Sequence, residues 1–200
     1  MEGSLPLRSC RPALLLAVAA AALIAGCGDG TQADDEAAGT YPVDITRADF
    51  PQRQRLGARE KFVLTVRNTG DQAVPDISVS VDSFVSPSTM TGLSDRSRPV
   101  WVVDTGPPGG DSAYVGTWTL GRLAPRASRT FTWRVVPVVP GDRTIRYRVN
   151  AGLHGQAKAT LADDAAPEGT IDVSVAEAPA ATSVDPETGD VLREGEAPEK

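Results

Sequence analysis

The stretch Lys61-Phe-Val-Leu-Thr-Val-Arg-Asn-Thr-Gly70 decides the fold class. Successive side chains of a strand point to opposite faces, so Phe62, Leu64 and Val66 share one apolar face. Asn-Thr-Gly then supplies the residue types that favour a turn. The stretch therefore predicts a half-buried β-strand that ends in a turn.

The next segment repeats this pattern. Ile77, Val79 and Val81 alternate with small polar and acidic residues, and residues 68–71 form the turn before them. Two alternating runs that flank a turn are typical of a β-hairpin. We expect residues 62–66 and 77–81 to pair in this way.

A second pair of strands is predicted further along the chain. Apolar side chains alternate over residues 131–135 and again over residues 145–149, with Pro140-Gly141 as the turn between them. We expect a second hairpin here. Weaker strand signals lie at residues 43–45, 100–103, 114–120, 157–161 and 171–175.

Many short strands with frequent turns indicate an all-β fold. Each apolar sheet face must be covered, which favours two packed sheets over one open sheet. We expect an antiparallel β-sandwich over residues 41–176, preceded by a flexible tether and followed by an acidic tail.

The chain resembles the immunoglobulin-like modules of bacterial surface proteins. The resemblance rests on residues 61–70, on Leu123-Ala-Pro-Arg126, on Trp133, and on Pro140-Gly141 before residues 145–151. Among these modules, the chain resembles the cell-adhesion-related domain found in bacteria. The resemblance implies an immunoglobulin-like sandwich and says little about activity.

The N-terminus has the layout of a bacterial lipoprotein signal. Two arginines precede an apolar run over residues 13–25, which is shorter than the roughly 20 residues of a membrane span. Leu23-Ile24-Ala25-Gly26-Cys27 resembles a lipobox, which implies cleavage after residue 26 and a diacylglyceryl group on Cys27. The alternatives are an ordinary secretory signal or an uncleaved anchor in which Cys27 is incidental. The predicted location is the extracytoplasmic face of the cell membrane.

The segments on either side of the predicted sandwich are polar. Residues 28–40 carry no large apolar side chain, so residues 27–40 are expected to form a lipidated, flexible tether. Residues 177–200 hold seven acidic and two basic residues, against 14 and 16 in residues 41–176, and we expect this tail to be disordered. A nearly neutral body argues against nucleic-acid binding.

A Gly/Pro-rich loop over residues 104–114 is one candidate binding segment. Loops at the ends of sandwiches often carry binding residues. Possible partner contacts are Trp101, Asp104, Asp111 and Tyr114. The loop could equally be a plain connector with its tryptophans in the core.

Outward-facing arginines form another candidate. Arg134, Arg146 and Arg148 could line up as a basic stripe that meets an anionic polymer, lipid head groups or the acidic tail. An ordinary charged sheet face is the alternative, because acids and bases nearly balance in the body.

Catalytic and metal sites have little support. The sole histidine, His154, lies in a predicted turn, and no Gly-x-Ser-x-Gly elbow accompanies Ser83, Ser112 or Ser128. The acidic cluster Asp163, Asp164 and Glu168 lacks the spacing of a calcium loop. We expect no cofactor and no metal.

These patterns favour a non-catalytic lipoprotein that binds another envelope component, a protein or a glycan, or acts as a structural accessory. A solute-binding or catalytic lipoprotein that uses the 104–114 loop is the alternative. The oligomeric state is left open by the sequence.

Overall fold

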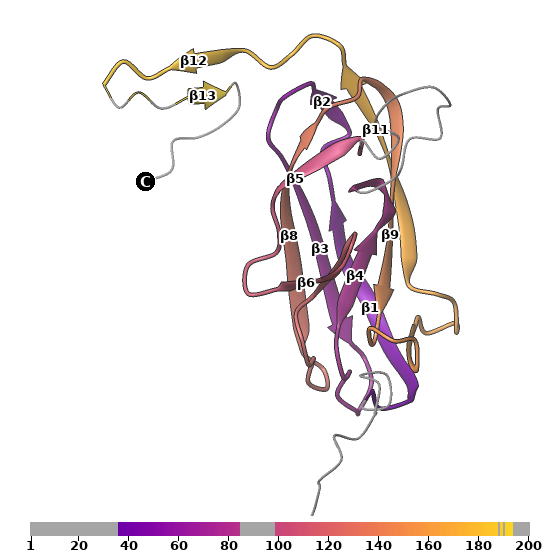
Figure 1. Cartoon of the computed structure of the whole chain (residues 1–200). Helices are drawn as coiled ribbons and strands as arrows, with labels where there is room; N and C mark the ends of the chain where they lie inside the picture. The colour runs from indigo at the N-terminus through magenta and orange to yellow at the C-terminus, as the bar shows by residue number, and fades with distance from the viewer. Residues whose placement is uncertain (1–35, 85–98, 188, 190, 194–200) are drawn as a thin grey trace, which may run out of the picture.

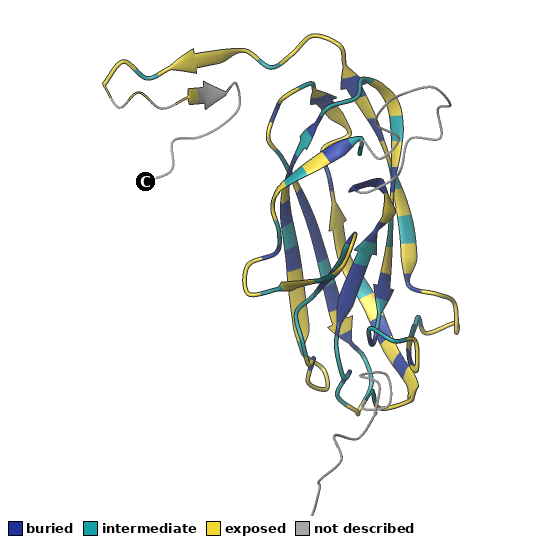
Figure 2. Ribbon diagram, viewed as in Figure 1, coloured by how far each residue is buried: buried dark blue, intermediate teal, exposed yellow. Residues whose placement is uncertain are grey.

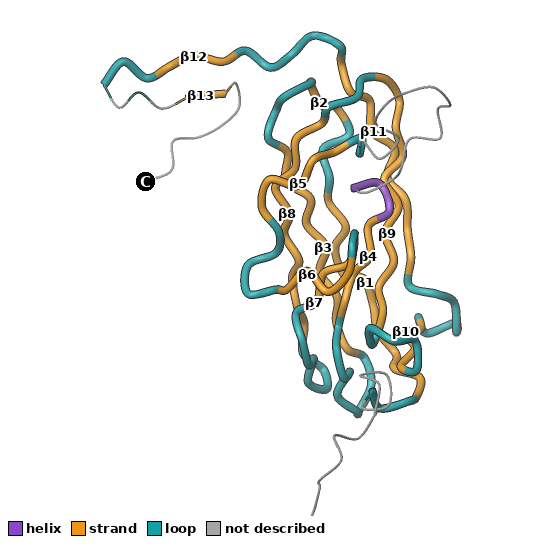
Figure 3. The backbone as a smooth tube through the Cα atoms, in the orientation of Figure 1, coloured by secondary structure: helices purple, strands orange, loops and turns teal. Residues whose placement is uncertain are grey.

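The computed structural model describes residues 36–84, 99–187, 189 and 191–193. Two β-sheets pack face to face, and loops connect them at both ends (Figure 1). Among these residues the only helix is the short 3-10 turn η1 (Asp82–Phe84), which Figure 3 shows as a single coiled segment. The predicted all-β sandwich is confirmed. No helix in the described part is long and apolar enough to cross a membrane.

The two sheets divide the strands as follows. The first sheet has the order β10 (Ala157–Thr160), β1 (Gly39–Asp49), β3 (Glu60–Asn68), β8 (Ser128–Pro137) and β5 (Trp101–Thr105). The second has the order β2 (Arg53–Arg55), β11 (Glu168–Ala176), β9 (Gly141–Asn150), β4 (Ser78–Val81), β7 (Thr117–Thr119) and β6 (Asp111–Tyr114). Most neighbours run antiparallel, but β1–β10 and β2–β11 are parallel, so the expectation of a purely antiparallel sandwich is wrong at these two edges.

The core is aromatic. All four phenylalanines and all three tryptophans of the sequence are buried. Figure 2 shows buried residues in dark blue along strands of both sheets. Trp133 lies at the centre, stacked on Phe62 with 5.1 Å between ring centroids and on Phe131 with 5.6 Å. Burying each such side chain stabilises the fold by about 1.5–3 kcal/mol.

Both predicted hairpins are wrong. β3 pairs with β1 and β8, whereas β4 pairs with β9 and β7 in the other sheet. β8 and β9 are likewise split between the sheets. The alternating pattern specifies which face of a strand is buried, and that face is equally well covered by a strand of the opposite sheet.

The signal at residues 114–120 contains two strands instead of one. β6 and β7 pair with each other across Val115 and Gly116, and Gly116 has a φ of 76°. That left-handed backbone suits glycine, which permits a tight turn at the tip. The tip leaves Val115 86% exposed.

The turn motif after β3 joins three segments. Asn68 is fully buried, and its Nδ2 donates to the carbonyl oxygens of Gln72 at 2.7 Å, Leu123 at 3.2 Å and Ala124 at 3.2 Å. Its Oδ1 accepts from the Gly70 backbone N–H at 2.9 Å. Residues 68–70 and 123–124, which belong to two of the segments that carry the resemblance, thus meet at one end of the sandwich.

The polar segments at the chain ends are more ordered than expected. β1 begins at Gly39, so the predicted tether over residues 27–40 is wrong at its C-terminal end. The tail, expected to be disordered, contains the antiparallel pair β12 (Thr182–Val184) and β13 (Val191–Arg193). Asp185 closes the turn between them by accepting from the backbone N–H of Glu187 and of Gly189. The signal segment and Cys27 lie outside the described residues.

Candidate binding groove

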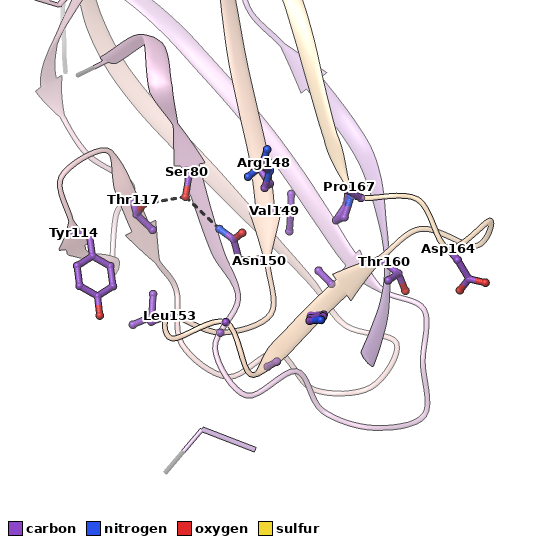
Figure 4. Close-up of a pocket in the computed structure, with 16 residues that line it drawn as sticks. Ser80, Tyr114, Thr117, Arg148, Val149, Asn150, Leu153, Thr160, Asp164 and Pro167 are labelled. Atoms are coloured by element: carbon purple, nitrogen blue, oxygen red, sulfur yellow. Dashed lines mark hydrogen bonds between the residues drawn. The ribbon is translucent and has the colours of Figure 1, made fainter. Parts of the chain in front are cut away.

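A groove of about 470 Å³ lies beside the outer face of β4, β7 and β9, at the end of the sandwich where β1 begins (Figure 4). We call it the β9 groove. Its volume falls within the range of about 300–1,000 Å³ that is typical of small-ligand sites. Its polar, charged and aromatic lining includes the side chains of Ser80, Tyr114, Thr117, Arg148, Asn150 and Lys158.

Strand register brings the floor of the groove together. Ser80 on β4 lies opposite Thr117 on β7 and opposite Arg148 on β9. The hydroxyl oxygens of Ser80 and Thr117 are 2.9 Å apart, and Asn150 Nδ2 donates to Ser80 Oγ at 3.2 Å. Dashed lines in Figure 4 mark this polar chain across three strands.

An aromatic pair stands at one end of the groove. Tyr114 is half exposed, and its hydroxyl lies 3.3 Å from Nδ1 of His154. The two rings meet edge to face with 6.4 Å between centroids. Figure 4 shows the Tyr114 ring to one side of the floor residues Ser80, Thr117 and Asn150.

Charges in and around the groove nearly cancel. Arg148 forms an ion pair with Glu168 of β11, with Nη2 and Oε2 2.9 Å apart. Lys158 and Asp164 line the groove as one base and one acid. The site therefore has no strong field of either sign.

Glu36 holds the loop that forms one wall of the groove. Its carboxylate accepts from the backbone N–H of Leu153 at 2.9 Å, His154 at 2.6 Å and Ala157 at 2.6 Å. A Cβ on Gly152 would overlap this carboxylate. We call the contact the Glu36 latch.

Two opposing effects act on the pKa of the Glu36 carboxyl. Burial raises the pKa of the Glu36 carboxyl, and the backbone hydrogen bonds, led by that from Ala157, lower it. The hydrogen bonds together outweigh burial, so the pKa of Glu36 lies below its ordinary value of 4.5.

The structure places the candidate residues around the 104–114 loop in different surroundings. Trp101 is fully buried and its Nε1 donates to Gln54 Oε1 at 2.7 Å, so its proposed role as a surface contact is wrong and it belongs to the core. Asp104 lies 3.4 Å from Nε of Arg59 on the first sheet. Asp111 is exposed on β6, and only Tyr114 joins the groove.

The predicted basic stripe is wrong. Arg134 lies on β8 of the first sheet, whereas Arg146 and Arg148 lie on β9 of the second. All three are exposed, so Arg134 points to the opposite side of the sandwich from the other two. Sequence spacing could not show that the two strands belong to different sheets.

The residues of the predicted acidic cluster make separate contacts. Glu168 pairs with Arg148, while Asp163 Oδ1 accepts from the backbone N–H of Ala165 at 3.2 Å. Across the described residues, no group of three His, Cys, Asp or Glu side chains is placed to hold a metal ion.

Several groove residues were not singled out from the sequence. Ser80, Thr117 and Asn150 are short polar residues on strands, and such residues usually face solvent without a further role. Their outward direction follows from the period of two, but their proximity depends on the β7–β4–β9 order. Glu36 lies in the segment that the sequence predicts to be a flexible tether.

Comparisons with known proteins give no family assignment. No known family profile matches the chain, and no curated protein does. Similar solved structures include a CARDB domain from Pyrococcus furiosus in complex with di-metal ions, with 16% identity over 68% of this chain and 94% of that one, and a TM-score of 0.44. Native alpha-2-macroglobulin from Escherichia coli has 16% identity over 75% of this chain and 21% of that one, with a TM-score of 0.44.

A third similar structure is the complex of zinc 2-glycoprotein with prolactin inducible protein from human seminal plasma. The identity is 11%, over 68% of this chain and 94% of that one, and the TM-score is 0.40. These are likenesses between β-rich domains, and nothing about activity follows from them.

Proposed function

We propose that this protein is a bacterial lipoprotein, anchored through Cys27 to the extracytoplasmic face of the cell membrane, that binds another envelope component in the β9 groove. The observation that carries the proposal is the groove itself. It joins a polar floor from three strands to a half-exposed aromatic ring. Convergent polar groups beside an aromatic side chain are typical of recognition sites.

The position of the groove suits a protein tethered by its N-terminus. Eight residues separate Cys27 from Glu36 in the sequence. The nine residue-to-residue steps from position 27 to position 36 each extend the chain by at most about 3.6 Å, or roughly 30 Å in total. The latched loop therefore cannot lie farther than that from a lipidated cysteine. A partner in the membrane or the adjacent wall would be within reach.

The contacts of His154 and of the groove serine, Ser80, favour binding over chemistry. The ring of His154 bonds to Tyr114, and Ser80 bonds to Thr117 and Asn150, so histidine and serine here belong to separate contacts. A nucleophile and its base need a direct hydrogen bond or one through water.

In-cell crosslinking followed by mass spectrometry tests the proposal. The wild-type chain is compared with a Tyr114→Ala/Asn150→Ala double variant and with Val102→Ala, a matched control on the edge strand β5. We expect one envelope component to be recovered with wild type and control, and to be lost or reduced at least tenfold with the double variant. Equal recovery from all three proteins would show that the groove does not bind this component.

The anchor is tested separately with Cys27→Ser. We expect this variant to lose labelled fatty acid and to leave the membrane pellet, because the thioether can no longer form. Two acyl chains give stable anchoring, so the wild-type protein should stay in the pellet at high salt. A Cys27→Ser protein that is still acylated and membrane-bound would contradict the proposed anchor.

A further inference from the structure

We infer that the ligand of the β9 groove is a neutral glycan, bound by hydrogen bonds from the groove floor and by stacking of a sugar ring on Tyr114. This inference rests on the proposed binding function and adds the chemical class of the ligand. It is carried by the hydrogen-bond capacity of the floor, by the aromatic wall and by the balance of charge.

The floor presents a donor and an acceptor side by side. Ser80 and Thr117 share one hydrogen bond, so one of their two hydroxyl hydrogens is left to donate to a ligand whichever residue is the donor. Asn150 uses one amide hydrogen on Ser80, and its Oδ1 accepts from no described residue. In Figure 4 the amide oxygen points away from Ser80.

A sugar hydroxyl matches this arrangement because it is both a donor and an acceptor. Neighbouring hydroxyls on one ring could accept from the Ser80–Thr117 pair and donate to Asn150 at the same time. All three side chains are half-buried. Hydrogen bonds to partly desolvated groups discriminate strongly, since a ligand without the hydroxyls leaves them unpaired.

Tyr114 supplies the apolar part of such a site. Its ring is held by the contact with His154, yet half of its surface remains exposed. One face of a pyranose consists of C–H groups, which pack on an aromatic ring, while the hydroxyls project from its edge. The tyrosine at the end of a hydroxyl-lined floor therefore fits the two chemistries of one sugar ring.

The charges point to an uncharged ligand. Arg148 is neutralised by Glu168, and Lys158 is offset by Asp164 in the lining. Recognition of phosphate or carboxylate groups uses arginine forks or clusters that are free to bind. An anionic polymer would gain little from this groove.

The strands leave little room for a peptide that binds by strand addition. β4 is paired with β7 and β9, and β9 is paired with β4 and β11, so the backbone of the floor is already satisfied. β10 is an edge strand beside the groove, but it has only four residues. Strand addition needs a longer unpaired edge.

Calorimetric titration of the full chain in detergent micelles tests the inference. The probes are three neutral oligosaccharides, chitotetraose, mannotetraose and cellotetraose, with tetragalacturonate as the anionic counterpart. We expect at least one neutral probe to bind, and to bind about tenfold more weakly to Asn150→Ala and to Tyr114→Ala, the loss of one hydrogen bond or one stacking contact. Val102→Ala should bind like wild type.

Tyr114→Ala keeps the test decisive if Asn150→Ala fails to fold, because an exposed side chain at the end of β6 contributes little to the core. Binding of no neutral probe, preference for tetragalacturonate, or affinity unchanged in Tyr114→Ala would overturn the glycan assignment. A crosslinked protein partner that depends on the groove, with no oligosaccharide bound, would also overturn it while leaving the proposed binding function intact.

Discussion

At the scale of single residues, Asn68 joins segments that are distant in the chain. One buried amide group ties the end of β3 to the carbonyl oxygens of two other segments. The sequence indicates a turn at this position, because asparagine and glycine favour turns. It does not indicate that the amide crosses to Leu123 and Ala124, which lie more than 50 residues away in the chain.

We predict that Asn68→Ala lowers the free energy of unfolding by about 3 kcal/mol, since it leaves buried carbonyl oxygens without donors. Asn68→Asp should cost at least as much although the shapes match, because the donating nitrogen is replaced by an oxygen that faces those carbonyls. Urea unfolding measures both. A loss below about 1 kcal/mol in either variant would contradict the role given to this amide.

Tyr114 and Trp101 show why only part of the candidate site could be identified from the sequence. Both flank the same Gly/Pro-rich loop, and both were candidate contacts. The structure buries Trp101 against Gln54 and leaves Tyr114 half exposed. Aromatic residues near a loop fit either position, so only the packing around them separates a core side chain from a binding one.

At the scale of elements, the strands were more predictable than their pairing. Alternation over residues 62–66, 77–81 and 131–135 correctly gave the buried faces. It could not give the sheet to which each strand belongs, because a hairpin and a crossing between sheets bury the same side chains. The groove depends on the β7–β4–β9 order, so it was not predictable either.

The Glu36 latch is an element-scale contact with a pH dependence. The pKa of Glu36 lies below its ordinary value of 4.5, so the latch contributes stability above that pH and loses it as the pH falls through the lower, folded-state pKa. We predict that Glu36→Gln lowers the free energy of unfolding by about 1 kcal/mol at neutral pH, as loss of a helix cap does. The difference from wild type should shrink as the pH falls below 4.5 and through the folded-state pKa.

Gly152→Ala provides the matched variant for the latch. Its Cβ would displace the Glu36 carboxylate, so we expect it to remove the same contact. A double-mutant cycle measured by urea unfolding should therefore show that Glu36→Gln adds little in the Gly152→Ala background. Fully additive losses, or a Glu36→Gln effect that does not change with pH, would show that the latch is not a single contact.

At the scale of the whole molecule, the latch connects the predicted anchor to the groove. The chain enters the sandwich at Gly39, and Glu36 just before it holds the loop that walls the groove. Anchoring at Cys27 would keep this end of the sandwich near the bilayer. The acidic tail follows β11 and extends from the opposite end (Figure 1).

The most direct test of the binding function places a photo-crosslinking residue, p-benzoylphenylalanine, at position 114 or at position 102 in living cells. Tyr114 and Val102 are 50% and 44% exposed on different sheets, so the two positions differ in location more than in accessibility. We expect a reproducible adduct with one envelope component from position 114 and none from position 102. Equal adducts from both positions, or none from position 114, would contradict it.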